Sequence, residues 1–229
     1  MTYGPKYYIR AYATNTAGTA YSEGTGFNAV LTSICPDTFN IQHTALVRGA
    51  PVTKAVTYHA VQTSLSGASH CWITQNLGAD HQASFLADVT EASSGWYFQF
   101  NRSQGYKHDG TTHTPVPWVS AIDEASDWTP INDPCIIMLG VGWRLPTMTE
   151  YTNVVSNGGT PFTAALKFHY SGIMVWNPGG ASTFRGDSGI YWSSSAASSV
   201  NGYHLQLRTG QQAVVNNTKA YGFTVRCLR

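Results

Sequence analysis

Charged residues are scarce in this sequence. Asp, Glu, Lys and Arg make up 11% of its 229 residues, the formal net charge is +1, and no run of Lys or Arg occurs. Proteins that hold a phosphate backbone or an anionic membrane surface do so with clustered positive charge. We therefore expect no nucleic-acid partner.

Long apolar runs are also missing. No segment reaches the roughly 18 apolar residues needed to cross a bilayer, and residues 2–5 read Thr-Tyr-Gly-Pro, unlike the apolar stretch of a signal peptide. We expect no membrane insertion, and we expect the sequence to come from a longer exported protein.

The four cysteines form no C-x-x-C pair, which argues against a zinc ribbon and against a thioredoxin-type redox site. Two disulfides in an oxidising compartment are the favoured interpretation, with buried free thiols as the alternative. The expected location is extracellular, or at the surface of a cell or virion.

Motifs for catalysis and cofactor binding are absent too. The sequence has no Gly-x-Ser-x-Gly, no His-Glu-x-x-His and no phosphate loop, and its twelve acidic residues show no obvious pair for acid–base chemistry. We expect no enzymatic activity and no cofactor. His108 and His113 flank Asp109, but no further ligand is recognisable, so we expect a solvated loop and no metal site.

Gly, Tyr and Trp are abundant, which favours many short strands joined by turns. Residues 6–14 and 19–30 are strand-like around the turn sequence Asn-Thr-Ala-Gly, and YYIRAYATNTAGTAYSEGTGF resembles the last two strands of a fibronectin-type-III or related immunoglobulin-like domain. The resemblance implies that residues 1–32 end such a domain, with an immunoglobulin-like domain upstream, and that residues 33–229 form a second domain.

Within the second domain, strands are expected at residues 56–61, 71–77 and 95–100. The clearest helix start follows Pro146, because Thr147 and Glu150 have the spacing of a capping box, and this helix should run to about residue 157. A weaker helical stretch is expected at residues 121–127.

The C-terminal forty residues are expected to be strands at residues 189–192, 203–208, 211–215 and 222–227. Residues 203–208 alternate strictly between apolar and polar types. The alternation predicts that Tyr203, Leu205 and Leu207 face the core and that His204, Gln206 and Arg208 face solvent.

Four blocks occur in a fixed order. They are Cys-Trp-Ile-Thr-Gln-Asn-Leu at 71–77, Gly-Trp-Arg-Leu-Pro-Thr at 142–147 with Glu150, Tyr-Trp-Ser-Ser-Ser at 191–195, and Tyr-Gly-Phe-Thr-Val-Arg-Cys at 221–227. In this combination, residues 70–229 resemble the Fibrobacter succinogenes major paralogous domain family of exported bacterial proteins. The resemblance implies an α+β, C-type-lectin-like fold with small antiparallel sheets, long loops and one or two helices. The Arg-Leu-Pro-Thr block itself is interpreted as architectural, with Trp143 in the core and Thr147 as a helix cap.

Cys135 lies shortly before the block at residues 142–147, and Cys227 lies in the expected last strand. The resemblance implies that these two segments meet in the core. On that basis we expect Cys135 to pair with Cys227 and Cys35 with Cys71, one of three connectivities that four cysteines allow. Formylglycine-generating enzymes share the Arg-Leu-Pro-Thr-x-x-Glu and Gly-Phe-x-x-Arg-Cys blocks. They need two reactive cysteines near the C-terminal groove, where this chain has only Cys227.

Tyr, Ser, Asn and Gly concentrate between residues 191 and 221, and antibody loops use the same residue types. Ordinary surface polarity is an alternative explanation, and Ser193 to Ser195 can simply hydrogen-bond their own backbone. We expect a ligand-binding face made of Tyr191, Ser194, Ser195, Ser198, Asn201, Tyr203, His204, Gln206, Arg208, Asn216 and Asn217.

Three hypotheses follow. The first is a secreted or surface-displayed binding or adhesion module that recognises a protein or glycan through its C-terminal strands and loops. The composition of residues 191–221 is compatible with the hypervariable segment of proteins that diversity-generating retroelements rewrite. The second is an enzyme of the formylglycine-generating type, and the third is a structural subunit of a fimbria or phage tip.

Overall fold

A computed structural model describes residues 6–9, 11–23, 25–28, 35–109, 111–115, 118–175 and 180–229. The chain divides into two units, Met1–Ile34 and Cys35–Arg229. The division lies close to the expected boundary between residues 32 and 33. Each unit is described by itself.

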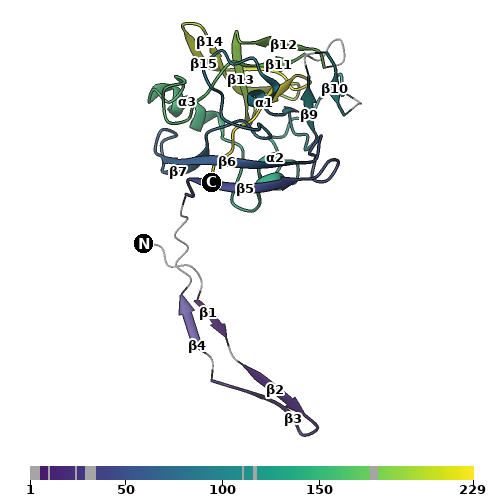
Figure 1. Cartoon of the computed structure of the whole chain (residues 1–229), viewed down its shortest axis with the longest axis vertical. Helices are drawn as coiled ribbons and strands as arrows, with labels where there is room; N and C mark the ends of the chain where they lie inside the picture. The colour runs from purple at the N-terminus through teal and green to yellow at the C-terminus, as the bar shows by residue number, and fades with distance from the viewer. Residues whose placement is uncertain are drawn as a thin grey trace. The chain divides into compact units, whose positions relative to one another are not determined.

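The first unit is a β-hairpin, as the sequence predicts (Figure 1). β2 (Tyr12–Asn15) pairs with β3 (Gly18–Tyr21), and β1 (Lys6–Ile9) pairs with β4 (Thr25–Asn28). The Asn15 side chain accepts a hydrogen bond from the Ala17 backbone at 2.8 Å, and Gly18 has a φ of 135°, which a side chain would disfavour.

The second unit is an α+β domain, and its described residues form two sheets (Figure 1). The smaller is antiparallel: β5 (Thr38–His43), β6 (Lys54–Thr63) and β7 (His70–Ile73). The larger, mixed sheet has the order β10 (His113–Thr114), β9 (Gly105–His108), β8 (Tyr97–Gln99), β16 (Gly222–Thr224), β11 (Ser171–Met174), β13 (Ser188–Ala196), β14 (Asn201–Arg208) and β15 (Gln211–Thr218), with β12 (Ser182–Arg185) beside β11.

The described part of this domain contains three helices: α1 (Glu91–Ser94), α2 (Pro134–Leu139) and α3 (Met148–Ser156). α3 is the helix expected after Pro146. The Thr147 hydroxyl accepts from the Glu150 backbone and the Glu150 carboxylate accepts from the Thr147 backbone, so the capping box is confirmed. The helix expected at residues 121–127 is wrong, because that segment is irregular.

Glu150 also binds Arg144, which donates to both carboxylate oxygens at 2.6 and 2.8 Å. Burial alone would raise the pKa of Glu150, but the Arg144 guanidinium and the Thr147 backbone lower it below its ordinary value. The Arg-Leu-Pro-Thr block therefore fixes the entry to α3, as the architectural interpretation predicts.

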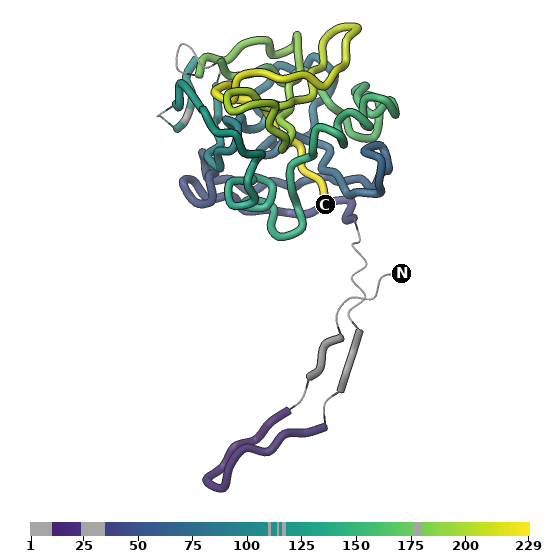
Figure 2. The backbone as a smooth tube through the Cα atoms, turned by 180° about the vertical axis from the view of Figure 1, so that it is seen from behind, coloured from purple at the N-terminus to yellow at the C-terminus, as the bar shows by residue number. Residues whose placement is uncertain are grey.

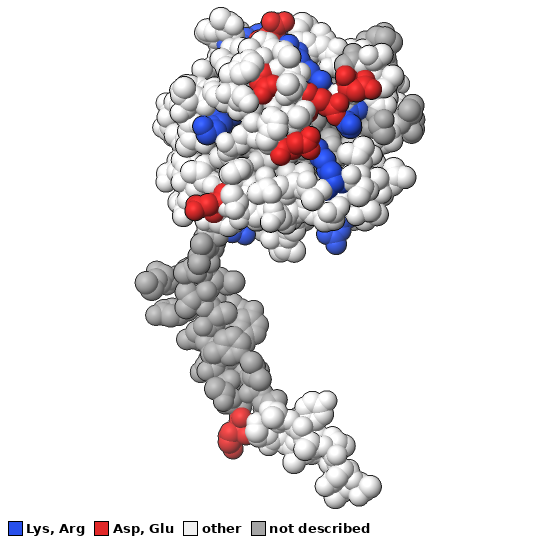
Figure 3. Space-filling model, in the orientation of Figure 1, with Lys and Arg blue, Asp and Glu red and all other residues white. Residues whose placement is uncertain are grey.

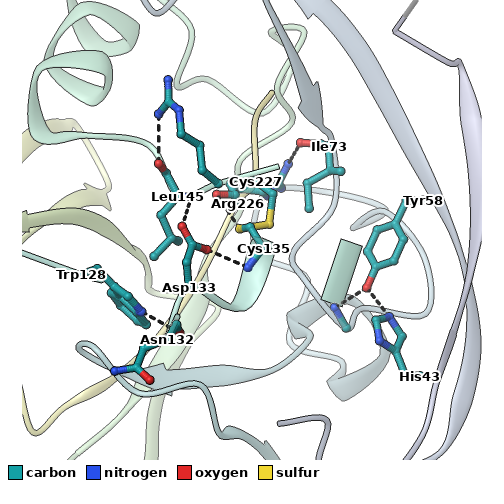
Figure 4. The surroundings of a disulfide bond; sticks show 12 residues. His43, Tyr58, Ile73, Trp128, Asn132, Asp133, Cys135, Leu145, Arg226 and Cys227 are labelled. Carbon is teal, nitrogen blue, oxygen red and sulfur yellow. Dashed lines mark hydrogen bonds between the residues drawn. A yellow bond between two sulfur atoms is a disulfide. The ribbon is translucent and has the colours of Figure 1, made fainter. Parts of the chain in front are cut away.

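Both expected disulfides are present, Cys35–Cys71 and Cys135–Cys227. Figure 4 shows Cys135–Cys227 between α2 and the end of the chain, with Asp133 beside it. The Asp133 carboxylate accepts from the backbone of Cys135 at 2.8 Å and of Leu145 at 2.9 Å, while burial raises its pKa. This region ties α2 and the Arg-Leu-Pro-Thr block to the segment after β16, which ends at Thr224 and is shorter than the strand expected at residues 222–227.

Among the described residues, the buried apolar side chains form three groups. One surrounds Trp96, Trp143 and Trp192, a second lies under α3, and a small third group consists of Tyr97, Tyr106 and Met174. No helix among the described residues is long and apolar enough to cross a membrane.

Candidate functional site

The C-terminal strands that carry the expected site form two antiparallel hairpins. β14 pairs with β13 on one side and with β15 on the other, and β15 is the last strand on that side of the sheet. The β14–β15 turn, residues 209–210, lies at the rim of the domain (Figures 1 and 2).

The expected binding residues do not share one face. Tyr203 lies opposite Asn216, and Asn201 lies opposite Thr218. Because side chains alternate along a strand, Gln206 and Arg208 lie on the other face of the sheet. The residues expected to form one ligand face are therefore divided between the two faces of the sheet.

Two of the expected binding residues are buried. Tyr191 is fully buried beneath α3, and its hydroxyl donates to the His169 carbonyl at 2.6 Å. His204 is 1% exposed and packs edge-on against Trp192 and Phe223, so the expectation that it faces solvent is wrong. Alternation failed as a guide here because the middle of β14 has core on both faces.

The serines of the expected face hold the local backbone. Ser195 accepts a hydrogen bond from the Met148 backbone at the start of α3, and Ser198 accepts from the backbones of Val200 and Asn201. The backbone of Ser194 bonds to Pro146 and Trp128. Ser193 to Ser195 lie in β13, so the expectation of a loop at these residues is wrong. The Ser195 backbone does donate to the Ser193 hydroxyl, but the other contacts of Ser194 and Ser195 reach distant segments.

A groove of about 500 Å³ opens at the β14–β15 turn, and Arg208 is the expected binding residue that lines it. Its apolar part consists of Leu86, Pro161, Phe162 and Tyr170, and Thr163 and Gln212 add polar groups. A groove of this size can take a ligand group comparable to a few side chains.

Arg208 is exposed and is held by a neighbour on its own face. With the amide oxygen of Gln206 facing the guanidinium, that oxygen accepts hydrogen bonds from Nε and Nη2 of Arg208, each at 2.9 Å. Among the described residues no carboxylate forms an ion pair with Arg208. The guanidinium is thus oriented, and part of its hydrogen-bonding capacity is available to a ligand.

Large apolar side chains lie exposed beside the groove. Leu86 is part of the lining, and its neighbours Phe85 and Val89 are 58% and 55% exposed. Phe184 is 48% exposed, and the following turn at Gly186 lies close to Val89. We call Phe85, Leu86, Val89 and Phe184 the apolar rim. Figure 3, which shows one side of the molecule, has few charged side chains on a mostly uncharged surface.

The described residues of the 108–113 segment are held by hydrogen bonds within the chain. Asp109 accepts from the backbones of Thr111 and Thr112 and from the Thr112 hydroxyl, and these hydrogen bonds lower its pKa to about 2. The His108 ring accepts from the Ser182 backbone. Within the described residues, no group of three or more His, Cys, Asp or Glu side chains is placed to hold a metal.

Sequence reasoning missed most of the groove, because Leu86, Phe162 and Tyr170 come from loops far from β14 in the chain. Nothing in their local sequence marks them as neighbours of Arg208. Comparison with known proteins adds no relative: no family model, no curated protein and no solved structure matches this chain.

Proposed function

We propose that residues 35–229 form the ligand-binding module of a secreted or surface-displayed protein, and that it takes a protein ligand in the groove at the β14–β15 turn. The observation that carries this proposal is Arg208, oriented by Gln206 and without a carboxylate partner among the described residues, above an apolar groove. Such a site suits a carboxylate beside an apolar side chain.

The apolar rim favours a protein over a glycan. Monomeric proteins rarely expose contiguous large apolar patches unless a partner covers them, and aromatic residues with Arg dominate interface energetics. A sugar instead presents many hydroxyl groups, and each needs a polar partner when it is buried. The groove supplies few such partners.

The two disulfides fit an oxidising, extracellular location. They also weaken the enzyme alternative, because a formylglycine-type oxidation needs reactive thiols and all four cysteines are paired. We therefore propose a non-enzymatic role.

The C-type-lectin-like fold and the family resemblance remain part of the proposal. They are supported by the way the sequence blocks meet: the backbones of Ile73 and Leu77 donate to the carbonyls of Cys227 and Val225, and Arg144 pairs with Leu228. A hypervariable, retroelement-diversified surface also stays a proposal, and of its expected residues Ser198, Arg208, Asn216 and Asn217 are exposed.

The test is selection from a random peptide phage library, with a glycan array in parallel, using the full chain. We expect peptides that carry Asp or Glu next to an aromatic residue. Their affinity should fall at least tenfold with Arg208→Ala or Phe162→Ala and stay unchanged with Asn216→Ala, on the other face of the hairpin.

Glycan hits alone, or peptide binding that survives both groove substitutions, would contradict the proposal. The third hypothesis, a structural subunit, predicts self-association at micromolar concentration instead, which analytical ultracentrifugation measures. His204 is left unchanged in these variants because its replacement would disturb the core.

A further inference from the structure

The small sheet has one covered edge and one open edge. β7 is covered by the end of the chain, since the Cys71 and Ile73 backbones donate to the carbonyls of Arg229 and Cys227. β5 pairs with β6, and no other strand among the described residues pairs with its second edge. Figure 1 shows β5 on the outside of the domain, with β6 next to it.

The register of β5 identifies which backbone groups point outward. Asp37 accepts from Ala60, so the pair 37 and 60 is hydrogen-bonded, and the alternation of an antiparallel ladder gives the same status to residues 39, 41 and 43. The N–H and C=O groups of Thr38, Asn40 and Gln42 therefore point away from β6. An extended chain can pair with such a row.

A cleft of about 450 Å³ runs along this edge. Five consecutive residues, 40–44, line it, and since neighbouring side chains in a strand point to opposite faces, the strand backbone itself forms one wall. The opposite wall is the end of α2 at Met138 and Leu139, together with Val47, which is 53% exposed.

One cation stands in the cleft. Arg48 lines it, is exposed, and forms no ion pair with any described residue. None of the described residues that line the cleft is Asp or Glu. The backbone beside Arg48 is pinned: Gly49 has a φ of 77°, a Cβ there would lie 2.0 Å from the Ser103 carbonyl oxygen, and its own carbonyl accepts from Gly105. Arg48 itself is held at a φ of 54°, an unfavourable value that its surroundings must maintain.

The open edge also lacks the usual protection. Exposed edge strands are commonly guarded by Lys, by Pro or by a bulge, but β5 reads Thr-Phe-Asn-Ile-Gln-His and pairs with β6 in continuous register. The charge in the cleft is of one sign. Both features favour an extended peptide that carries a carboxylate.

We propose that β5 is a second binding surface, separate from the groove at the β14–β15 turn, where an extended peptide segment of another protein adds as a strand. The backbone of the peptide pairs with Thr38, Asn40 and Gln42. A carboxylate of the peptide binds Arg48, and one of its apolar side chains enters the cleft beside Val47 and Leu139.

The probe is the acetylated, amidated peptide Val-Thr-Val-Glu-Val-Thr, titrated into the isotope-labelled full chain and followed by amide NMR signals. Shifts should concentrate at residues 38–44 and 47–48. The same peptide N-methylated at every residue is the matched control, and it should cause no shift there because it cannot donate backbone hydrogen bonds. Arg208→Ala should leave the titration unchanged.

Arg48→Glu should weaken the peptide about tenfold, and a peptide with Lys in place of Glu should regain affinity for that variant. Asn40→Pro should abolish binding, because it removes an outward N–H that β6 does not use; if this variant fails to fold, the N-methylated peptide decides the point. Shifts absent from β5 at millimolar peptide, or equal shifts with the N-methylated peptide, would overturn the proposal.

Discussion

Arg226, which follows the end of β16, and Arg208, the last residue of β14, have opposite surroundings. Arg226 is 1% exposed and donates to Asn76 and to the carbonyls of Ile73, Leu166 and Lys167. Arg208 is exposed, and it donates to the amide oxygen of Gln206. The N–H groups of Arg226 are occupied by acceptors inside the protein, while Arg208 keeps N–H donors that a ligand can use.

The contrast extends to the sequence blocks around them. Asn76 belongs to the first block and Arg226 to the last, and their side chains meet at 2.8 Å in the core. Burial lowers the pKa of Arg226 to about 10, and the rings of Phe168 and Tyr191 lie 5.0 and 5.9 Å from its guanidinium. The blocks thus meet in the interior of the domain, and we call this region, together with the Cys135–Cys227 disulfide, the seam. Arg208 and the groove belong to no block.

The largest effect should come from the disulfide in that seam. Cys135 and Cys227 are 92 residues apart, so replacing both by Ala should lower the free energy of unfolding by about 4.5 kcal/mol through the loop entropy gained by the unfolded chain. Urea unfolding measures this change. A loss below about 1 kcal/mol would show that the seam does not depend on the bond.

Arg226→Met should lower the free energy of unfolding by about 3 kcal/mol, because it leaves buried oxygens of Asn76, Leu166 and Lys167 without donors. Arg208→Met is the matched control, since the residue type and the substitution are the same. Equal melting temperatures for the two variants would remove the proposed difference between the arginines.

His204 should make the free energy of unfolding of the domain sensitive to acid. Burial lowers its pKa to about 4, below the ordinary 6.5, so the unfolded chain takes up the proton first and stability falls as pH drops from about 6.5 toward 4. Between pH 6.5 and 5 this histidine alone should account for a loss of about 1.5 kcal/mol.

The variant His204→Phe keeps a ring between Trp192 and Phe223 and should lose that share of the pH dependence. The pKa values of His43 and His169 are lowered to about 4 and about 3, also by burial, so the variant should retain some acid sensitivity. Parallel stability curves for the variant and the unmodified protein between pH 6.5 and 5 would count against a neutral, buried His204.

A smaller effect is expected at the start of α3. Thr147→Ala removes the acceptor for the Glu150 N–H and should lower the free energy of unfolding by about 1 kcal/mol. Thr147→Ser keeps the hydroxyl and should restore most of it. Thermal melts in which both variants match the unmodified protein would mean that the cap does not contribute.

The sequence predicted what short-range chemistry determines. The capping box at Thr147, the turn at Asn15 and the β14–β15 hairpin depend on residues a few positions apart. Both disulfides were expected from the resemblance between whole blocks. α2 was missed although its signal was present, since Asp133 caps a helix that begins with Pro134.

Long-range packing explains the errors. Residues 121–127 are irregular because Lys219, which is fully buried, donates to the carbonyls of Glu124 and Ser126 and holds the segment against β15. His204 faces inward because aromatic side chains cover a face that alternation assigned to solvent. The groove joins loops separated by more than a hundred residues, which no local pattern reveals.

The smallest stability effect is expected at the groove, and it would sharpen the comparison most. Arg208 is exposed, so Arg208→Ala should change the free energy of unfolding by no more than about 0.5 kcal/mol. Its effect on binding should be large, because an oriented guanidinium that pairs with a ligand carboxylate in a partly apolar site is hard to replace by water. Gln206→Ala should weaken the same ligand less, since it frees the guanidinium to move without removing its charge. Urea unfolding and the affinities of the selected peptides give both quantities for each variant. A marked loss of stability in Arg208→Ala with unchanged affinity would place Arg208 with Arg226, as part of the fold rather than of the binding site.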